Sequence, residues 1–285
     1  MKGIILAGGM GSRLFPATLA ISKQLLPIYD KPLIYYPLST LMSLGIREIL
    51  LISTEHDLPA FQRLLGNGAD FGIALHYACQ NTPNGIAQAL IIADHFLHNE
   101  PCILILGDNI FYGQALSHIL QLDDSFQGAL SFALKVPNPQ RFGVVYFDNG
   151  KVIDIIEKPK SPPSEYAITG IYALDGNAAT LAKTLKPSHR QELEITDLQK
   201  IYLTNNKLNV YCLPDDFIWF DTGTISGLYQ ANQWVKHTEE KIGKKIGAVE
   251  LLAYQNGWID KNQLKKRAEH MKNSEYGQFL LNYIE

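Results

Sequence analysis

A glycine-rich loop follows the first apolar run of the chain and carries residue types that bind phosphate. Leu6 precedes Gly8, Gly9 and Gly11 within the stretch LAGGMGSRL, and Arg13 follows them. Glycines let the backbone close around a polyphosphate and point its N–H groups inward. An arginine adds a forked cation for the phosphate oxygens. The loop therefore predicts a phosphate site, with a tight surface turn as the alternative.

Two familiar phosphate loops do not fit this spacing. A P-loop requires a lysine directly after its last glycine, and here Ser12 and Arg13 follow Gly11. A dinucleotide-binding loop requires a third glycine at the start of a helix, and that glycine is absent. Asp30 lies where a ribose-binding acid would be expected, but the second strand begins only at Glu48. The spacing disfavours NAD and leaves a nucleoside triphosphate as the interpretation.

Two aspartates far apart in the sequence are candidate metal ligands. Asp108 follows the apolar run Cys102–Leu106 in the motif LGDN, and Asp221 stands in WFDTGT. Ligand-binding groups of parallel sheets usually lie where strands end, and paired carboxylates hold Mg²⁺ through oxygen. Each aspartate alone is more typical of a turn or a helix cap, but together with the glycine-rich loop the pair favours metal ligation.

The elements that must position these residues alternate in type over the first half of the chain. Strands are expected at residues 2–6, 48–53, 73–78 and 102–106, with helices at 37–44, 58–65 and 85–96. This order is typical of a parallel sheet covered on both faces. Later stretches read as antiparallel strands at 128–136, 142–159 and 166–174, then a helix at 194–203, a strand at 208–213 and a helical tail from about 227.

Composition narrows the class of protein. The chain has 285 residues, of which 46% are hydrophobic, and a formal charge of -3, so it has no basic field for nucleic acid. No apolar run approaches a membrane span, and no signal peptide is apparent, so we expect a cytoplasmic protein without a membrane partner. Cys79, Cys102 and Cys212 form no CxxC pair and are expected in the core.

A set of motifs in order gives the chain a family resemblance. KGIILAGGMGSRLFP, SKQLLPIYDKPLIYYPLSTL, LGDNIFYG, RFGVVYFD, ELEITD and DTGT occur along the whole sequence, which resembles the bacterial glucose-1-phosphate thymidylyltransferases. The resemblance implies a Rossmann-like, three-layer α/β nucleotidyltransferase fold with a mostly parallel sheet and an added antiparallel layer. It further implies a catalytic domain over residues 1–240 and a helical C-terminal tail over 241–285 that packs on it.

The same resemblance implies a reaction. A phosphate oxygen of glucose 1-phosphate would attack the α-phosphorus of dTTP, giving dTDP-glucose and pyrophosphate, as the first step toward dTDP-rhamnose or related deoxysugars of cell-surface polysaccharides. The attacking phosphate is already ionised, so positioning and charge neutralisation would carry catalysis without an amino-acid nucleophile. Mg²⁺ is the implied cofactor. The family is generally homotetrameric and inhibited by the end product at a second site near a subunit interface.

Site residues follow from the motifs that match. Arg13 would steady the leaving pyrophosphate, Lys23 the reacting phosphates and Lys158 the phosphate of the sugar, while Asp108 and Asp221 would bind the metal. Gln80 offers a donor and an acceptor to the imide edge of the base. The implied nucleotide-binding residues are Leu6, Gly8, Gly9, Gly11, Ser12, Arg13, Lys23, Gln24, Gln80, Gly85 and Asp108; the sugar-binding residues are Asn109, Gly143, Glu157, Lys158, Ile168 and Trp219.

Two alternatives stay open at the level of sequence. Uracil lacks only the methyl group of thymine, a contact worth about 1–3 kcal/mol, so a UTP-dependent pyrophosphorylase is one alternative. A sugar-nucleotide-binding regulator that has lost turnover is the other. Met10 in the glycine loop and Gln191 before ELEITD depart from the usual family pattern, but neither removes a charge that the chemistry needs.

Overall fold

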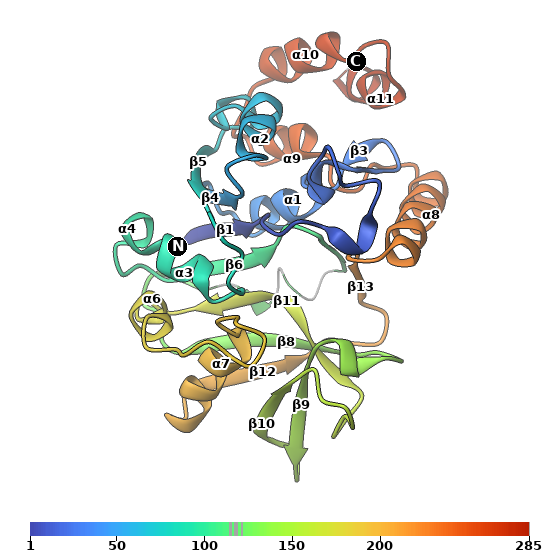
Figure 1. Ribbon diagram of the computed structural model, residues 1–285. Coiled ribbons are helices and arrows are strands. Elements are labelled where there is room, and N and C mark those ends of the chain that lie inside the picture. The colour runs from blue at the N-terminus through green and yellow to red at the C-terminus, as the bar shows by residue number, and fades with distance from the viewer. Residues whose placement is uncertain (114–115, 117–118, 121, 285) are drawn as a thin grey trace.

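A single mixed sheet crosses the molecule, with helices on both of its faces (Figure 1). The computed structural model describes residues 1–113, 116, 119–120 and 122–284. The main path of the sheet runs β10-β9-β11-β6-β1-β4-β5, and β8 and β12 pair beside β11. The strands of the parallel part are β1 (Lys2–Leu6), β4 (Glu48–Ser53), β5 (Ala74–Cys79) and β6 (Cys102–Leu106).

The antiparallel part continues this sheet. β11 (Tyr166–Leu174) pairs antiparallel with β6, with Ile171 opposite Ile105. The other antiparallel strands are β8 (Ala129–Lys135), β9 (Gly143–Asp148) and β10 (Lys151–Glu157). Beyond them, β12 (Leu208–Cys212) pairs parallel with β8. β9 and β10 form the hairpin that projects at the bottom of Figure 1. The predicted α/β fold with an antiparallel addition is confirmed, and the addition is joined to the parallel strands by backbone hydrogen bonds.

Side chains that alternate along the parallel strands bury two separate apolar layers. Ile5 and Leu51 face one cluster, while Ile4 and Leu50 face the other. The first face is covered by α1 (Tyr35–Ser43), α2 (Leu58–Leu65) and α9 (Val249–Gln255). The second is covered by α3 (Gln88–Ile92), α6 (Ala178–Ala182) and α7 (Ile195–Thr204). Burial on both faces explains why these strands are almost continuously apolar.

The helical tail consists of four helices. These are α8 (Ile225–Ile242), α9, α10 (Lys261–His270) and α11 (Glu275–Ile284). Thr224 caps α8 and Asp260 caps α10 through side-chain hydrogen bonds, as expected for residues that satisfy free N–H groups at helix starts. The boundary predicted between residues 240 and 241 falls in the last turn of α8.

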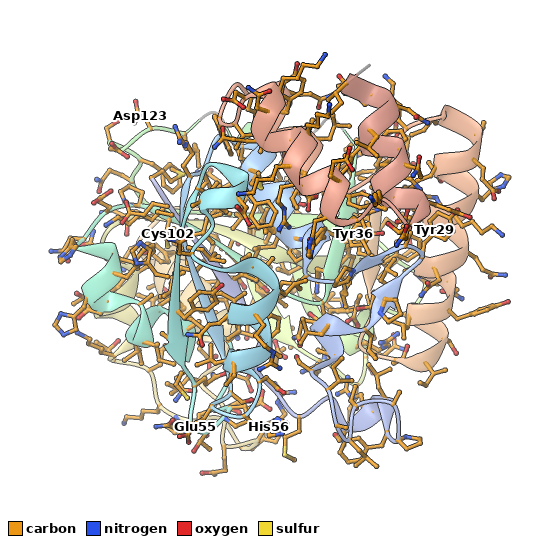
Figure 2. The ribbon with its side chains drawn as sticks, turned by 90° about the horizontal axis from the view of Figure 1, so that it is seen from above. Tyr29, Tyr36, Glu55, His56, Cys102 and Asp123 are labelled. Carbon is orange, nitrogen blue, oxygen red and sulfur yellow. The ribbon has the colours of Figure 1, made fainter. Side chains whose placement is uncertain are left out.

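The tail packs on the N-terminal half through buried aromatic and charged side chains. The Tyr276 hydroxyl of α11 donates to Glu250 of α9 at 2.5 Å, and the Tyr35 hydroxyl of α1 donates to the same carboxylate at 3.3 Å. Figure 2 shows Tyr29 and Tyr36 beside the C-terminal helices, away from Cys102 in the sheet. The tail is thus held to the segment that follows the glycine-rich loop.

Several boundaries differ from the sequence expectations. The first helix begins at Tyr35 rather than residue 37, and the helix expected over 85–96 is divided into α3 and α4 (Asp94–Leu97) at Ala93; nothing in the sequence explains this interruption. Cys102 is buried but Cys212 is exposed, so the core prediction for Cys212 is wrong. Within the described residues, no helix has the length and apolar character needed to cross a membrane.

Two short sheets were not expected from the sequence. β2 (Pro27–Ile28) pairs with β3 (Lys31–Pro32). β7 (Asn109–Tyr112) pairs antiparallel with β13 (Ile218–Asp221), so that Asp221 lies opposite Asn109. A pair of four-residue strands more than 100 residues apart leaves no periodic signal in the sequence. This second sheet is nevertheless what brings the two candidate metal ligands together.

Candidate active site

The glycine-rich loop leaves β1 and turns into a single 3-10 turn. Gly9 and Gly11 have positive φ values of 92° and 59°, which side chains rarely adopt. Gly11 precedes the 3-10 turn Ser12–Leu14, which carries Arg13. A Cβ at Gly8 would lie only 2.2 Å from Oε1 of Gln80. The loop therefore requires glycine for its conformation at two positions and for space at a third.

Lys23 and Asp108 form a half-buried ion pair behind this loop. Lys23 begins the 3-10 turn Lys23–Leu25, and its ammonium donates to Oδ2 of Asp108, which follows β6. The side chains are 17% and 13% exposed, so water screens the pair only weakly. Burial alone would raise the pKa of Asp108, but the Lys23 charge and hydrogen bond hold it below its usual value.

Asp221 reaches the same place from the end of β13. The backbone N–H and the hydroxyl of Thr222 donate to the carbonyl oxygen of Asp108 at 3.1 Å and 2.8 Å, which fixes the two aspartate segments together. The Asp221 carboxylate accepts from the N–H of Gly223 at 3.1 Å and from Arg141 at 3.1 Å. Burial, and then the negative charge of Asp108, raise the pKa of Asp221. Two carboxylates close enough to repel each other form a natural place for a cation.

Two cavities meet at these residues. One is lined by the glycine-rich loop together with Lys23, Gln24, Pro83 and Glu192; we call it the nucleotide cavity. The other is lined by strands β9, β10 and β11 and by Trp219; we call it the sugar cavity. Arg13, Ile86, Leu106, Asp108 and Asp221 line both. A group bound in each cavity would meet its neighbour beside Arg13 and the two aspartates.

Most residues predicted from the sequence line one cavity or the other. In the nucleotide cavity these are Leu6, Gly8, Gly9, Gly11, Ser12, Arg13, Lys23, Gln24, Asp108 and Asp221. In the sugar cavity they are Arg13, Asp108, Asn109, Gly143, Glu157, Lys158, Ile168, Trp219 and Asp221. Residues whose sequence positions span more than 200 places are thus gathered into one site.

Gln80 and Gly85 lie outside the cavity linings formed by the described residues. Gln80 is 2% exposed, and its amide donates to Oε1 of Gln88 at 2.7 Å. At Gly85, a Cβ would lie 2.4 Å from the carbonyl oxygen of Leu193. The structure thus explains Gln80 by its contacts with Gln88 and Gly8 and explains Gly85 by its close approach to Leu193, and a contact with the base stays a prediction.

Glu157 is an acid of the sugar cavity whose carboxylate has three polar neighbours. Its Oε1 lies 3.3 Å from Arg190 and 3.1 Å from Lys158, and its Oε2 accepts from the Thr196 hydroxyl at 3.3 Å. Opposite it, a Cβ at Gly143 would lie 2.7 Å from Cγ2 of Thr196. The carboxylate is therefore held in place at a wall that carries no side chain at residue 143. A fixed acceptor of this kind suits sugar hydroxyl groups.

Asn109 is fixed from two sides. Its amide nitrogen donates to Oδ1 of Asp108 at 3.0 Å, and its oxygen accepts from Nε1 of Trp219 at 2.5 Å. A Cβ at Gly170 would lie 2.4 Å from that amide oxygen. Trp219 therefore determines the orientation of the Asn109 amide and, through it, supports the neighbouring aspartate.

Sequence reasoning missed Arg141, Arg190 and Thr196. Arg190 donates to Glu192 at 2.7 Å and to Glu194 at 2.8 Å, besides Glu157, and hydrogen bonding to Glu194 raises its pKa. The run RQELE, a cation followed by two acids, is a signal for this cluster. No comparable signal marks Arg141, because an arginine before a strand is usually a surface residue.

Lys158 adopts a backbone conformation that is unusual for its residue type. Its φ is 42°, while its N–H donates to the carbonyl oxygen of Phe142 at 3.0 Å. A side chain in the left-handed region costs about 1–2 kcal/mol, and such outliers cluster at functional sites. The strain is consistent with a lysine held at the rim of the sugar cavity.

Fold and site together define a class of protein, the nucleotidyltransferases. A glycine-rich backbone and two cations line one cavity, a hydrogen-bonded acid lines the next, and two aspartates line both. The chain belongs to the nucleotidyl transferase family, whose pattern matches residues 2–238.

Curated relatives extend this assignment over the whole chain. The chain is 51% identical to a glucose-1-phosphate thymidylyltransferase of Neisseria gonorrhoeae, covering 100% of this chain and 99% of the relative. It is 49% identical to the enzyme of that name from Mycolicibacterium smegmatis, with the same coverage.

Solved structures agree with the fold. A proposed glucose-1-phosphate thymidylyltransferase from Bacillus anthracis matches with a TM-score of 0.77 and 40% identity, covering 82% of this chain and 94% of that chain. A UDP-glucose pyrophosphorylase matches with a TM-score of 0.74 at 22% identity, covering 83% and 98%, a likeness of fold alone.

Proposed function

We propose that this enzyme transfers the thymidylyl group of dTTP to glucose 1-phosphate, giving dTDP-glucose and pyrophosphate. The observation that supports it most is the meeting of a phosphate-binding cavity and a sugar-type cavity at Arg13, Asp108 and Asp221. Relatives at 46–51% identity over almost the whole chain carry the name of this activity.

The nucleotide cavity would hold the triphosphate. Backbone N–H groups at Gly9 and Gly11 offer donors to its oxygens, and Arg13 and Lys23 supply positive charge. Because Lys23 is already paired with Asp108, its ammonium has a fixed position before the substrate enters. Such preorganised charge costs no reorganisation when pyrophosphate begins to leave.

Asp108 and Asp221 would hold Mg²⁺. They fit this role because they are hard oxygen ligands and converge from two segments fixed by Thr222. Burial, and then repulsion by Asp108, raise the pKa of Asp221. When bound, the metal would neutralise charge on the reacting phosphates. Every other contribution comes from side chains and backbone N–H groups that bind and orient the two substrates.

The sugar cavity would orient glucose 1-phosphate for attack. Glu157 and Asn109 accept or donate hydrogen bonds to hydroxyl groups, while Lys158 and Arg190 supply positive charge for the phosphate. Both cations already contact Oε1 of Glu157, so phosphate recognition and hydroxyl recognition share one hydrogen-bonded cluster. An analogue that lacks a hydroxyl group would leave part of this cluster unpaired.

Several finer points belong to the proposal and follow from the family resemblance. These are preference for dTTP over UTP, a place at the start of a dTDP-rhamnose or related pathway for cell-surface polysaccharides, a homotetrameric state and a cytoplasmic location. Inhibition by dTDP-rhamnose is tested by adding it well above the substrate concentrations, and an unchanged rate would refute it. The homotetramer is tested by light scattering after size-exclusion chromatography.

The test of the activity is pyrophosphate release from purified enzyme with glucose 1-phosphate and Mg²⁺, offering dTTP, dUTP, 5-methyl-UTP and UTP separately. These four nucleotides vary the methyl group and the 2′-hydroxyl independently. Strong release with dTTP is expected. Release with UTP alone would move the enzyme to a UTP-dependent activity, and silence with all four would favour the binding regulator.

A further inference from the structure

Arg141 joins the sugar cavity to one of the two candidate metal ligands. It ends the 3-10 turn Pro139–Arg141 between β8 and β9. Its Nη2 donates to Oδ2 of Asp221 at 3.1 Å across 80 positions in the sequence, and it lines the sugar cavity. The side chains of Arg141 and Asp221 are 42% and 20% exposed, so the pair lies at the mouth of the site rather than on open surface.

An aromatic stack fixes the position of this arginine. Its guanidinium carbon lies 5.4 Å from the ring centroid of Phe142, and the Phe142 ring lies 4.9 Å from that of Trp219. Trp219 is itself fixed by its hydrogen bond to Asn109. Contacts of this kind favour arginine over lysine, because a planar guanidinium both stacks and donates.

The pairing mirrors that of Lys23 with Asp108 on the opposite side of the site. Each buried carboxylate has one cation, but Lys23 lies in the nucleotide cavity and Arg141 in the sugar cavity. A guanidinium has five N–H donors, and among the described residues only one of these makes a hydrogen bond. The remaining donors are available to an anion in the sugar cavity.

We propose that Arg141 is a positioning residue that neutralises Asp221 before the substrates bind and then turns to the phosphate of glucose 1-phosphate when a divalent cation takes over Asp221. This inference rests on the proposed function. A divalent cation at Asp221 would supply the charge that the guanidinium now supplies. The arginine, held beside the cavity by Phe142, would then have an unpaired charge that a phosphate can neutralise.

A measurable coupling follows from this exchange. Arg141 cannot neutralise Asp221 and the sugar phosphate fully at the same time. Mg²⁺ at Asp221 must therefore tighten the binding of glucose 1-phosphate. Glucose 1-phosphate must in turn tighten the binding of Mg²⁺ by the same factor. Removal of Arg141 must weaken sugar-phosphate binding and reduce this coupling to the part that the metal exerts directly on the phosphate. A merely structural loss of packing on Phe142 would weaken binding equally with and without the metal.

The test uses wild type, Arg141→Gln and Arg141→Lys, with Lys200→Gln as a control for the loss of an exposed ion pair, that of Lys200 with Asp154. Pyrophosphate release by wild type is measured first, so failure of the proposed function appears there and not in the variants. Isothermal titration then gives the affinity for glucose 1-phosphate with Mg²⁺ and with EDTA, in the presence of a dTTP analogue that cannot react.

In wild type and Lys200→Gln, we expect Mg²⁺ to tighten glucose 1-phosphate binding about tenfold, the order that a charge-assisted hydrogen bond supports. Arg141→Gln should bind about tenfold more weakly in Mg²⁺ and show a clearly smaller difference between Mg²⁺ and EDTA, with partial recovery in Arg141→Lys. Three results would each overturn the proposal. The wild type could bind glucose 1-phosphate equally well with and without Mg²⁺, or could turn over and yet show no binding of glucose 1-phosphate. The third is a coupling in Arg141→Gln that equals that of the wild type.

Discussion

The nucleotide cavity and the sugar cavity are built from different parts of the polypeptide. One continuous loop after β1 supplies much of the lining of the nucleotide cavity, and this loop requires glycines with positive φ or no room for a Cβ. The sugar cavity is built from side chains on β9, β10, β11, β13 and α7, and its acids and cations are paired with one another. Substitutions that change side-chain volume should therefore disturb the glycine-rich loop most, whereas substitutions that remove a charge should disturb the sugar cavity most.

The largest expected effect comes from the place where the two cavities meet. Asp221→Asn removes one of two carboxylates while preserving size, and turnover should fall by about a thousandfold, a loss comparable to removing a key electrostatic contact. The melting temperature should change little, because burial already raises the pKa of this carboxyl. The measurement is kcat together with thermal denaturation.

Asp216→Asn is the matched control, since Asp216 is an exposed aspartate five residues earlier. It should keep full activity. Near-normal turnover in Asp221→Asn would show that the site works without this carboxylate, and Asp108 would then be the one remaining candidate metal ligand of the pair.

The sugar cavity can be disturbed separately through Glu157. Glu157→Gln keeps the shape but removes the charge that binds Lys158, Arg190 and Thr196. Hydrogen bonds to charged groups contribute about 1.5–3 kcal/mol, so KM for glucose 1-phosphate should rise roughly tenfold to a hundredfold. KM for dTTP should stay the same.

Steady-state kinetics with each substrate varied in turn distinguishes the two effects. The control is Glu165→Gln, which removes an exposed acid paired with Lys135 and should change neither KM. An equal rise in both KM values for Glu157→Gln would mean that the two cavities do not bind their substrates independently.

This difference between the cavities also explains how much of the site could be predicted from the sequence. The glycine-rich loop is contiguous, so its spacing alone predicts a phosphate site, and the alternating strands predict the α/β sheet. Arg141 and Thr196 contact their partners only through the fold, and the short β7–β13 sheet that positions Asp221 has no periodic pattern. A single sequence predicts features whose residues are contiguous, such as the glycine-rich loop. It does not predict which charged residues from distant segments become partners.

Gln80 illustrates the boundary between these cases. Its type predicts a base contact, but its amide is buried against Gln88 and beside Gly8. A side chain alone does not reveal whether its donors are used by a ligand or by the protein. Assigning a role to Gln80 therefore requires knowledge of its neighbours in the fold, Gln88 and Gly8.

A substitution at Gly8 tests the shape requirement of the nucleotide cavity. In Gly8→Ala the new Cβ would lie 2.2 Å from Oε1 of Gln80, so either the loop or the glutamine must move. Overpacking of this kind costs about 1–3 kcal/mol, and KM for dTTP should rise about tenfold while KM for glucose 1-phosphate stays the same.

The double variant Gly8→Ala/Gln80→Ala decides what Gln80 does. If its role is to pack against the loop, the smaller residue makes room for the methyl group and most of the affinity for dTTP returns. If Gln80 reads the base, the double variant binds dTTP more weakly than either single variant. Measurement of KM for dTTP and UTP in all four proteins separates the two results.

The smallest effect is expected where the two cavities approach each other through the 188–194 loop. Gln191 has a φ of 62°, a conformation that glycine adopts without strain, and it stands between Arg190 of the sugar side and Glu192 of the nucleotide cavity. Gln191→Gly relieves about 1–2 kcal/mol of backbone strain in the folded protein. Part of this gain is offset because glycine increases the conformational entropy of the unfolded chain. A net gain of about 1 kcal/mol corresponds to a rise of about 2 °C in melting temperature for a chain of this size.

Gln191→Ala is the control, because it retains the strained backbone and should leave the melting temperature unchanged. Turnover should be the same in all three proteins, because the backbone of this loop is held by Leu193, whose N–H donates to the carbonyl oxygen of Asn84 at 2.7 Å. A loss of turnover in Gln191→Gly alone would mean that a stiff backbone at residue 191 helps to hold Arg190 and Glu192 in register, so that the two cavities are coupled through this loop as well as through the aspartates.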